Sequence, residues 1–123
     1  TDNPVLGHIT TFGGHPVCCA AGMAAMNVLL NEQLIAQVHA KEILFRSLLH
    51  HPKILAVRSR GLLVAVEFES FEQNKQIIDA CIAAGVFTDW FLFASDCLRI
   101  SPPLIISEQQ VKKACEVLVK ACD

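Results

Sequence analysis

The stretch RSRGLLVAVEF, residues 58–68, decides the fold class. Its bulkier apolar residues from Val64 onwards fall on alternate positions, which is the side-chain period of a β-strand. We expect two strands here, over residues 54–58 and 62–68, joined by a turn that ends at Gly61. Three apolar side chains would then share one face of the second strand: Val64, Val66 and Phe68.

Upstream of this hairpin, the spacing of the apolar residues is typical of helices. A helix is expected over residues 15–30 with Pro16 in its first turn, a position that suits a proline. Residues 16–31 carry no charge, so we expect this helix to be buried on all sides. A second helix would run from an Asn31 cap to residue 50, with Lys41 extending outward. Its expected apolar stripe is Leu34, Val38, Phe45, Leu48 and Leu49.

Downstream, two capping-box patterns mark the starts of further helices. Ser70 with Gln73 begins a helix that Gly85 would stop, and Ser107 with Gln110 begins the last helix. The core-facing residues expected on these two helices are Ile78, Cys81, Ile82, Val111, Cys115, Leu118 and Cys122. Three short strands are expected between the helices, over residues 86–88, 90–94 and 97–101, the last two joined at residues 95–96.

This order predicts an α+β fold. We expect a small, mostly antiparallel or mixed sheet with helices packed on one face, preceded by a long apolar helix. The aromatic run WFLF, residues 90–93, is expected in the core or in an interface.

Composition narrows the function classes. The chain has 123 residues, 53% hydrophobic and 18% charged, with a net charge of −2. The few scattered basic residues argue against a nucleic-acid-binding protein. The apolar run over residues 16–31 is too short and too alanine-rich for a membrane span. The six cysteines show no C-x-x-C pair, so we expect reduced thiols in the core of a cytoplasmic protein.

Two places could carry chemistry. The run Thr10-Thr11-Phe12-Gly13-Gly14 precedes a helix, where hydroxyls and backbone N–H groups can hold a phosphate, although such loops more often only form a turn. Arg99 lies in the apolar stretch LRISPPL. Its guanidinium would suit a ligand carboxylate, and the alternative is an edge-strand arginine in solvent or in a structural ion pair. The five histidines show no metal-ligand spacing, so no metal is expected.

Three stretches together resemble the class III aminotransferases, which use pyridoxal phosphate and have the fold type I architecture. They are TTFGGHPVCCAAGMAAMNVL, RSRGLLVAVEF, and GVF followed by LRISPPLIIS. The resemblance covers nearly the whole chain and corresponds to the C-terminal third of such enzymes. His15 stands where many members have asparagine, and some members do have histidine.

The resemblance implies roles for particular residues. Thr11, with Thr10 beside it, would contact the cofactor phosphate that is bound mainly by the neighbouring subunit of a homodimer. Arg99 would bind a substrate carboxylate, and Gly61 would serve the backbone conformation. The implied reaction moves an amino group from an ornithine-like, acetylornithine-like or other ω-amino donor to an oxo acid, with 2-oxoglutarate as the expected acceptor.

The resemblance also implies missing parts. The family's Schiff-base lysine lies upstream of the threonine–glycine motif, and no lysine precedes Lys41 here. The chain begins without a methionine, as a fragment would. We therefore expect residues 1–31 to be the cofactor loop and connecting helix, residues 32–123 to be the small domain, and the isolated chain to be inactive. A free-standing, non-enzymatic ligand-binding or dimerisation domain is the alternative.

Overall fold

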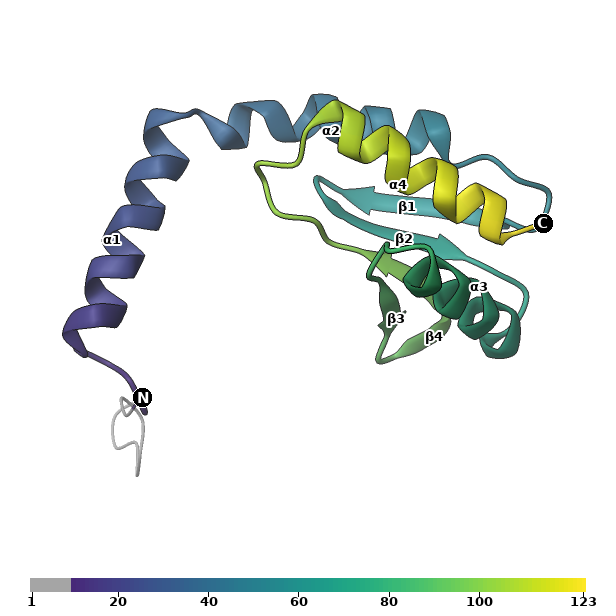
Figure 1. Ribbon diagram of the computed structural model, residues 1–123, viewed down its shortest axis with the longest axis horizontal. Coiled ribbons are helices and arrows are strands. Elements are labelled where there is room, and N and C mark those ends of the chain that lie inside the picture. Colours follow the sequence, from purple (N-terminus) through teal and green to yellow (C-terminus); the bar gives the residue numbers. More distant parts are fainter. Residues whose placement is uncertain (1–9) are drawn as a thin grey trace, which may run out of the picture. The chain divides into compact units, whose positions relative to one another are not determined.

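The computed structural model describes residues 10–123 (Figure 1). The chain divides into two compact units, one ending at Leu34 and the other spanning Ile35–Asp123. The elements follow in this order: α1 (Pro16–Asn31), α2 (Leu34–Leu48), β1 (Ala56–Arg60), β2 (Leu63–Glu67), α3 (Phe71–Ala83), β3 (Asp89–Phe91), β4 (Ala94–Ile100) and α4 (Glu108–Ala121). The predicted α+β order is confirmed.

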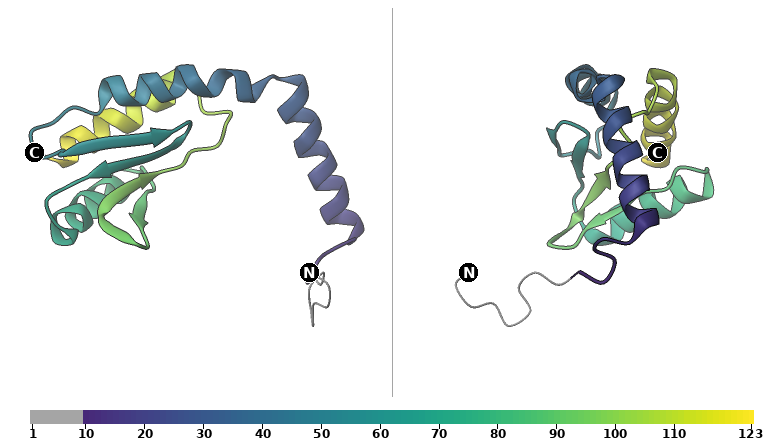
Figure 2. Two further views of the ribbon diagram at one scale, coloured as in Figure 1. Left: turned by 180° about the vertical axis from the view of Figure 1, so that it is seen from behind. Right: turned by 90° about the vertical axis from the view of Figure 1, so that its left-hand side faces the viewer.

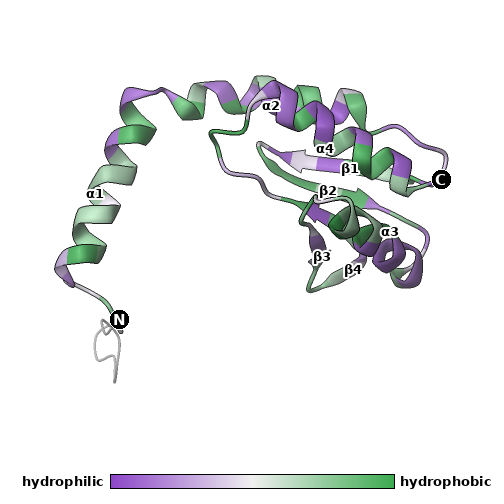
Figure 3. Cartoon of the chain, in the orientation of Figure 1, coloured by the Kyte–Doolittle hydropathy of each residue, from purple (hydrophilic) through white to green (hydrophobic). Residues whose placement is uncertain are grey.

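The first unit consists mainly of α1, which is apolar along most of its length (Figure 3). Pro16 occupies its first turn as expected. None of the helix is buried, and Met23 is 67% exposed. The expectation of burial on all sides is therefore not met within residues 10–123. No single helix in residues 10–123 is long and apolar enough to cross a membrane; α1 and α2 reach that length only when taken together.

The prediction that Asn31 caps the second helix is wrong. Asn31 is the last residue of α1, and α2 begins at Leu34 after Gln33, whose φ is +51°. Lys41 also differs from expectation: it is only 9% exposed, and its Nζ donates a hydrogen bond of 2.6 Å to the Leu104 carbonyl. A carbonyl far along the chain thus accepts a hydrogen bond from the ammonium group inside the fold.

The second unit contains a four-stranded sheet in the order β1-β2-β4-β3, with every pairing antiparallel. Gly61 lies in the tight turn between β1 and β2 with a φ of +60°. A Cβ atom there would lie 2.8 Å from Val38 Cγ1 on α2. Glycine is therefore required twice over, by the left-handed backbone and by the approach of the helix.

The core lies on one face of this sheet, where α3 and α4 lie on the same side (Figure 2). Val64 and Val66 of β2 and Leu98 of β4 are fully buried there. The predicted stripe of α2 and the predicted core side of α4 are confirmed as buried or partly buried. On α3 the prediction fails at Ile82, which is 45% exposed, whereas Ile77 is 3% exposed.

The second hairpin, formed by β3 and β4, differs from the predicted strands. Residues 86–88 form no strand, because Thr88 is held instead by its side chain, whose Oγ1 donates to the Arg99 carbonyl at 2.6 Å. The turn between β3 and β4 lies at Leu92–Phe93 rather than at residues 95–96. Phe93 is 97% exposed, so this part of the aromatic run is not core in the described chain.

Both predicted capping patterns place a serine at the helix start. Ser107 Oγ accepts from the Gln110 N–H, and the Gln110 side chain accepts in return from the Ser107 N–H. Ser70 Oγ likewise accepts from the Gln73 N–H, but the return bond goes to the N–H of Glu69. Only the pattern of Ser107 with Gln110 is therefore a complete capping box.

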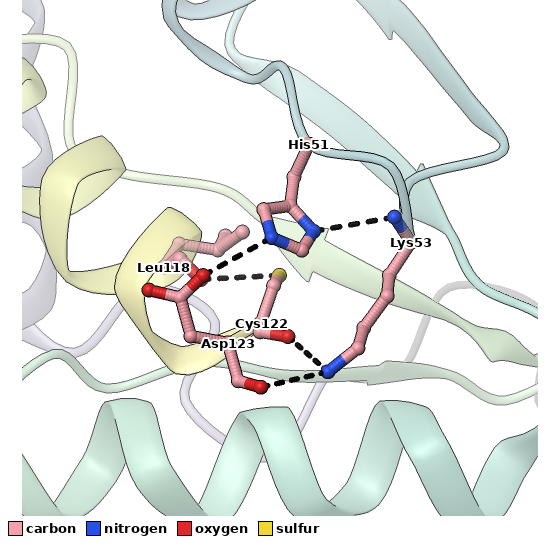
Figure 4. Close-up of polar contacts among 5 residues, drawn as sticks. All are labelled: His51, Lys53, Leu118, Cys122 and Asp123. Carbon is pink, nitrogen blue, oxygen red and sulfur yellow. Dashed lines mark hydrogen bonds and ion pairs between the residues drawn. The ribbon is translucent and has the colours of Figure 1, made fainter.

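The end of α4 is fastened to the loop before β1 (Figure 4). Lys53 Nζ donates to the carbonyls of Cys122 and Asp123, and His51 Nε2 lies 3.3 Å from Asp123 Oδ1. Cys122 Sγ donates within the helix to the Leu118 carbonyl at 3.3 Å. Cationic groups at this position also interact favourably with the helix dipole.

Candidate functional site

The threonine–glycine turn precedes α1. Thr10 and Thr11 are exposed, and the backbone turns back so that the His15 N–H donates to the Phe12 carbonyl at 3.1 Å. A Cβ atom on Gly13 would lie 2.0 Å from Thr10 Oγ1, so a larger residue there would require the Thr10 side chain to move. No side chain caps the start of α1. Exposed hydroxyls beside an uncapped helix N-terminus fit a phosphate group.

Arg99 lies on β4 directly opposite Asp89 of β3. Its Nε donates to Asp89 Oδ1 at 2.8 Å, and its Nη2 donates to Asp89 Oδ2. The guanidinium therefore holds a carboxylate with two parallel hydrogen bonds, which is the structural ion pair expected from the sequence as the alternative to a ligand carboxylate. The carboxylate in this structure belongs to the protein. Both side chains are partly exposed, at 41% and 38%.

Two cavities, each of about 400 Å³, meet at Arg99. The first is mostly apolar, and its lining includes Asp89, Val86, Pro102 and Ile106. The second opens on the face of the sheet opposite the hydrophobic core. Its lining includes Arg58, Ala65, Phe93 and Cys97.

The second arginine on this face, Arg58, is also paired. Strand register places Arg58, Ala65, Arg99 and Asp89 in one row across the sheet. Arg58 Nη1 donates to Glu67, and this bond raises the pKa of the Arg58 guanidinium. The face is thus a row of guanidinium–carboxylate pairs, with small Ala65 leaving space between the two arginines.

The cysteines offer no activated thiol in the sheet or helices of the second unit. Burial raises the pKa of the Cys97 thiol, with Asp96 adding to the effect, and burial raises the pKa of Cys115 to about 12. All four cysteines of this unit are free and buried, as expected; Cys18 and Cys19 on α1 are free and exposed, which corrects the expectation that they lie in a core. In residues 10–123 no group of His, Cys, Asp and Glu could hold a metal ion; His8 lies outside the described residues.

The structure brings Arg99 together with Asp89, which sequence reasoning missed. The signal was present: an aspartate and an arginine on the two strands of one hairpin, at positions that antiparallel pairing can place opposite each other. Thr10 and Thr11 belong to the first unit and Arg99 to the second, so each part of the predicted site is described by itself. The roles predicted for these three residues stay predictions.

The fold of this chain is similar to part of several solved aminotransferases. An aminotransferase from Bacillus anthracis is 26% identical and superposes with a TM-score of 0.82 over 94% of this chain and 30% of its own. The ornithine aminotransferase of Toxoplasma gondii is 29% identical, with a TM-score of 0.80 over 94% of this chain and 28% of its own. The acetylornithine aminotransferase of Elizabethkingia anophelis is 28% identical, with a TM-score of 0.80 over 94% of this chain and 32% of its own.

A sequence model of the class-III aminotransferases matches residues 2–122. The chain belongs to the class-III aminotransferase family. It spans about a third of the length of the solved relatives named above. Enzymes of this family depend on pyridoxal phosphate, and the Toxoplasma gondii structure is described with this cofactor in partial occupancy at its active site.

Proposed function

We propose that this chain is the C-terminal part of a pyridoxal-phosphate-dependent aminotransferase. The whole enzyme would transfer an amino group from an ornithine-like, acetylornithine-like or other ω-amino donor to an oxo acid, with 2-oxoglutarate as the acceptor. The proposal rests mainly on Arg99, which lines a largely apolar cavity. Its guanidinium already forms two parallel hydrogen bonds with a carboxylate, that of Asp89.

Arg99 would bind and orient the substrate carboxylate. Two parallel N–H donors fix both the position and the plane of a carboxylate, which a single charge does not. The apolar lining beside it, including Val86, Pro102 and Ile106, would exclude water and strengthen these bonds. Correct orientation of the reacting end then follows from the fixed far end of the substrate.

Thr11 and Thr10 would hold the phosphate of the cofactor. Their exposed hydroxyls and the uncapped start of α1 provide donors for an anion. The cofactor, when bound, supplies the electron sink for the amino-transfer chemistry. The lysine that attaches the cofactor in this family would lie outside this chain, because no lysine precedes Lys41 and Lys41 is engaged with the Leu104 carbonyl.

The exposed apolar surface of α1 supports an assembly larger than this chain. We place this surface against the rest of the enzyme in a cytoplasmic homodimer, in which residues 1–31 serve the cofactor and residues 32–123 form the small domain. The isolated chain would then be inactive.

The proposal is tested by transamination kinetics of the full-length protein with pyridoxal phosphate, ornithine or acetylornithine, and 2-oxoglutarate. Arg99→Gln should raise the KM for 2-oxoglutarate at least about tenfold, because a charge-assisted two-bond contact is lost. Arg60→Gln is the matched control, since Arg60 is an exposed arginine on the same sheet. Equal kinetics in the two variants would refute the role of Arg99, and no transamination from any ω-amino donor would refute the function.

A further inference from the structure

The guanidinium that the proposed function assigns to a substrate is already occupied. Asp89 takes the Nε and Nη2 donors of Arg99, which form the edge of the guanidinium best suited to a carboxylate. Within the described face of the sheet the other carboxylate, Glu67, is engaged by Arg58. Among the carboxylates of residues 10–123, Asp89 is therefore the one that a ligand carboxylate approaching Arg99 has to compete with.

The pair is held by the fold around it. Register places Asp89 opposite Arg99, and the neighbouring Thr88 Oγ1 donates to the Arg99 carbonyl at 2.6 Å, which fixes the two backbones together. The Phe91 ring lies beneath the guanidinium, with Arg99 Cζ 6.0 Å from the ring centroid. Both Asp89 and Phe91 thus help to position Arg99.

We propose that Asp89 is a specificity-determining residue that competes with substrate carboxylates for Arg99. This inference rests on the proposed function of Arg99. A substrate carboxylate gains the two bonds only by displacing Asp89 from Nε and Nη2, or it binds at the remaining Nη1 donors of a guanidinium whose charge is already balanced. In either case Asp89 lowers the affinity of the site for carboxylates.

The test is calorimetric titration of the full-length holoenzyme with glutarate, a dicarboxylate that has no oxo group and cannot accept an amino group. Asp89→Asn removes the competing charge and keeps the size of the side chain. It should tighten glutarate binding about fivefold, the upper end of what a partly exposed ion pair contributes. Asp89→Glu restores a carboxylate and should return the affinity towards that of the unmodified enzyme.

Asp79→Asn is the matched control, because it removes the same charge from an exposed site on α3 that pairs with Lys75. Its glutarate affinity should equal that of the unmodified enzyme. Asp89→Ser is the second variant if the asparagine variant does not fold, and the same tightening is expected. Equal or weaker binding in the folded asparagine and serine variants would overturn the proposal.

Arg99→Gln separates this inference from the function on which it rests. If Arg99→Gln abolishes glutarate binding while Asp89→Asn leaves it unchanged, Arg99 binds carboxylates and Asp89 does not compete. If Arg99→Gln leaves binding unchanged, the role of Arg99 fails and the inference fails with it. Competition predicts that Asp89→Asn has its effect only where Arg99 is present.

Discussion

Replacement of Gly61 by alanine should lower the free energy of unfolding for two reasons, the left-handed backbone at this position and the close approach of Val38. A left-handed alanine costs about 1–2 kcal/mol, and the lower entropy of the unfolded chain offsets about 0.4–1 kcal/mol of it. Gly85 has a comparable φ of +83° but no atom within 4 Å of its would-be Cβ. Gly85→Ala should therefore lower the free energy of unfolding by only about 1 kcal/mol.

At Gly61 the added methyl group also meets Val38 Cγ1 at 2.8 Å. Valine in a helix has one strongly preferred rotamer, so the side chain cannot turn away without cost. Overpacking of this kind costs about 1–3 kcal/mol, which brings the expected loss for Gly61→Ala to about 2–4 kcal/mol. Val38→Ala removes the contacted atom and should recover about 1 kcal/mol of that loss in the double variant.

The assay is urea denaturation of this chain followed by the fluorescence of Trp90, its only tryptophan. Trp90 packs edge-on against Phe71 of α3, so its signal reports the second unit. The cycle of Gly61→Ala with Val38→Ala should show coupling, and the cycle of Gly85→Ala with Val38→Ala should show none. Equal losses at the two glycines, or coupling absent from both cycles, would refute the reasoning.

Three further outcomes follow from the same structure. Ser107→Ala should lower the free energy of unfolding by about 1 kcal/mol, because the N–H of Gln110 loses its acceptor, and a thermal melt unchanged from that of the parent chain would contradict this. A thiol-alkylating reagent at neutral pH should label Cys18 and Cys19 in the folded chain and all six cysteines in urea, as counted by mass spectrometry; labelling of the buried thiols without urea would contradict the packing. The pKa of Cys115 is raised from 9.0 to about 12, so the unfolded chain loses a proton that the folded chain keeps, and stability should fall as pH rises from 9 towards 12. Cys115→Ala should make that fall shallower in denaturation curves measured across this range, and an unchanged slope would count against the buried thiol.

Alternation and helical period were sufficient to predict the elements whose faces are buried within the second unit. Val64 and Val66 were placed correctly because only one register puts them in the core. The β3–β4 turn was misplaced because Ser95 and Asp96 have the composition of a turn, whereas the residues that form it, Leu92 and Phe93, are apolar. Such a turn carries no compositional signal.

Features that depend on distant partners were not predictable from local pattern. Lys41 is buried because the Leu104 carbonyl, 63 residues away, accepts its hydrogen bond. The pairing of Asp89 with Arg99 depends on strand register. The apolar character of α1 predicted burial, but no residue of α1 is buried by the part of the chain that the structure describes. The roles of Thr11 and Arg99 came from family resemblance, since residue type alone left a turn and an ion pair as alternatives.

A single-turnover experiment on the full-length protein tests the central claim most directly. The purified enzyme, loaded with pyridoxal phosphate, is mixed with ornithine or acetylornithine, and 2-oxoglutarate is added after the donor has been removed. We predict that glutamate then forms in an amount equal to the active sites, and that the isolated 123-residue chain under the same conditions forms none. Absence of glutamate from the full-length enzyme with either donor, or its formation by the isolated chain, would contradict the account.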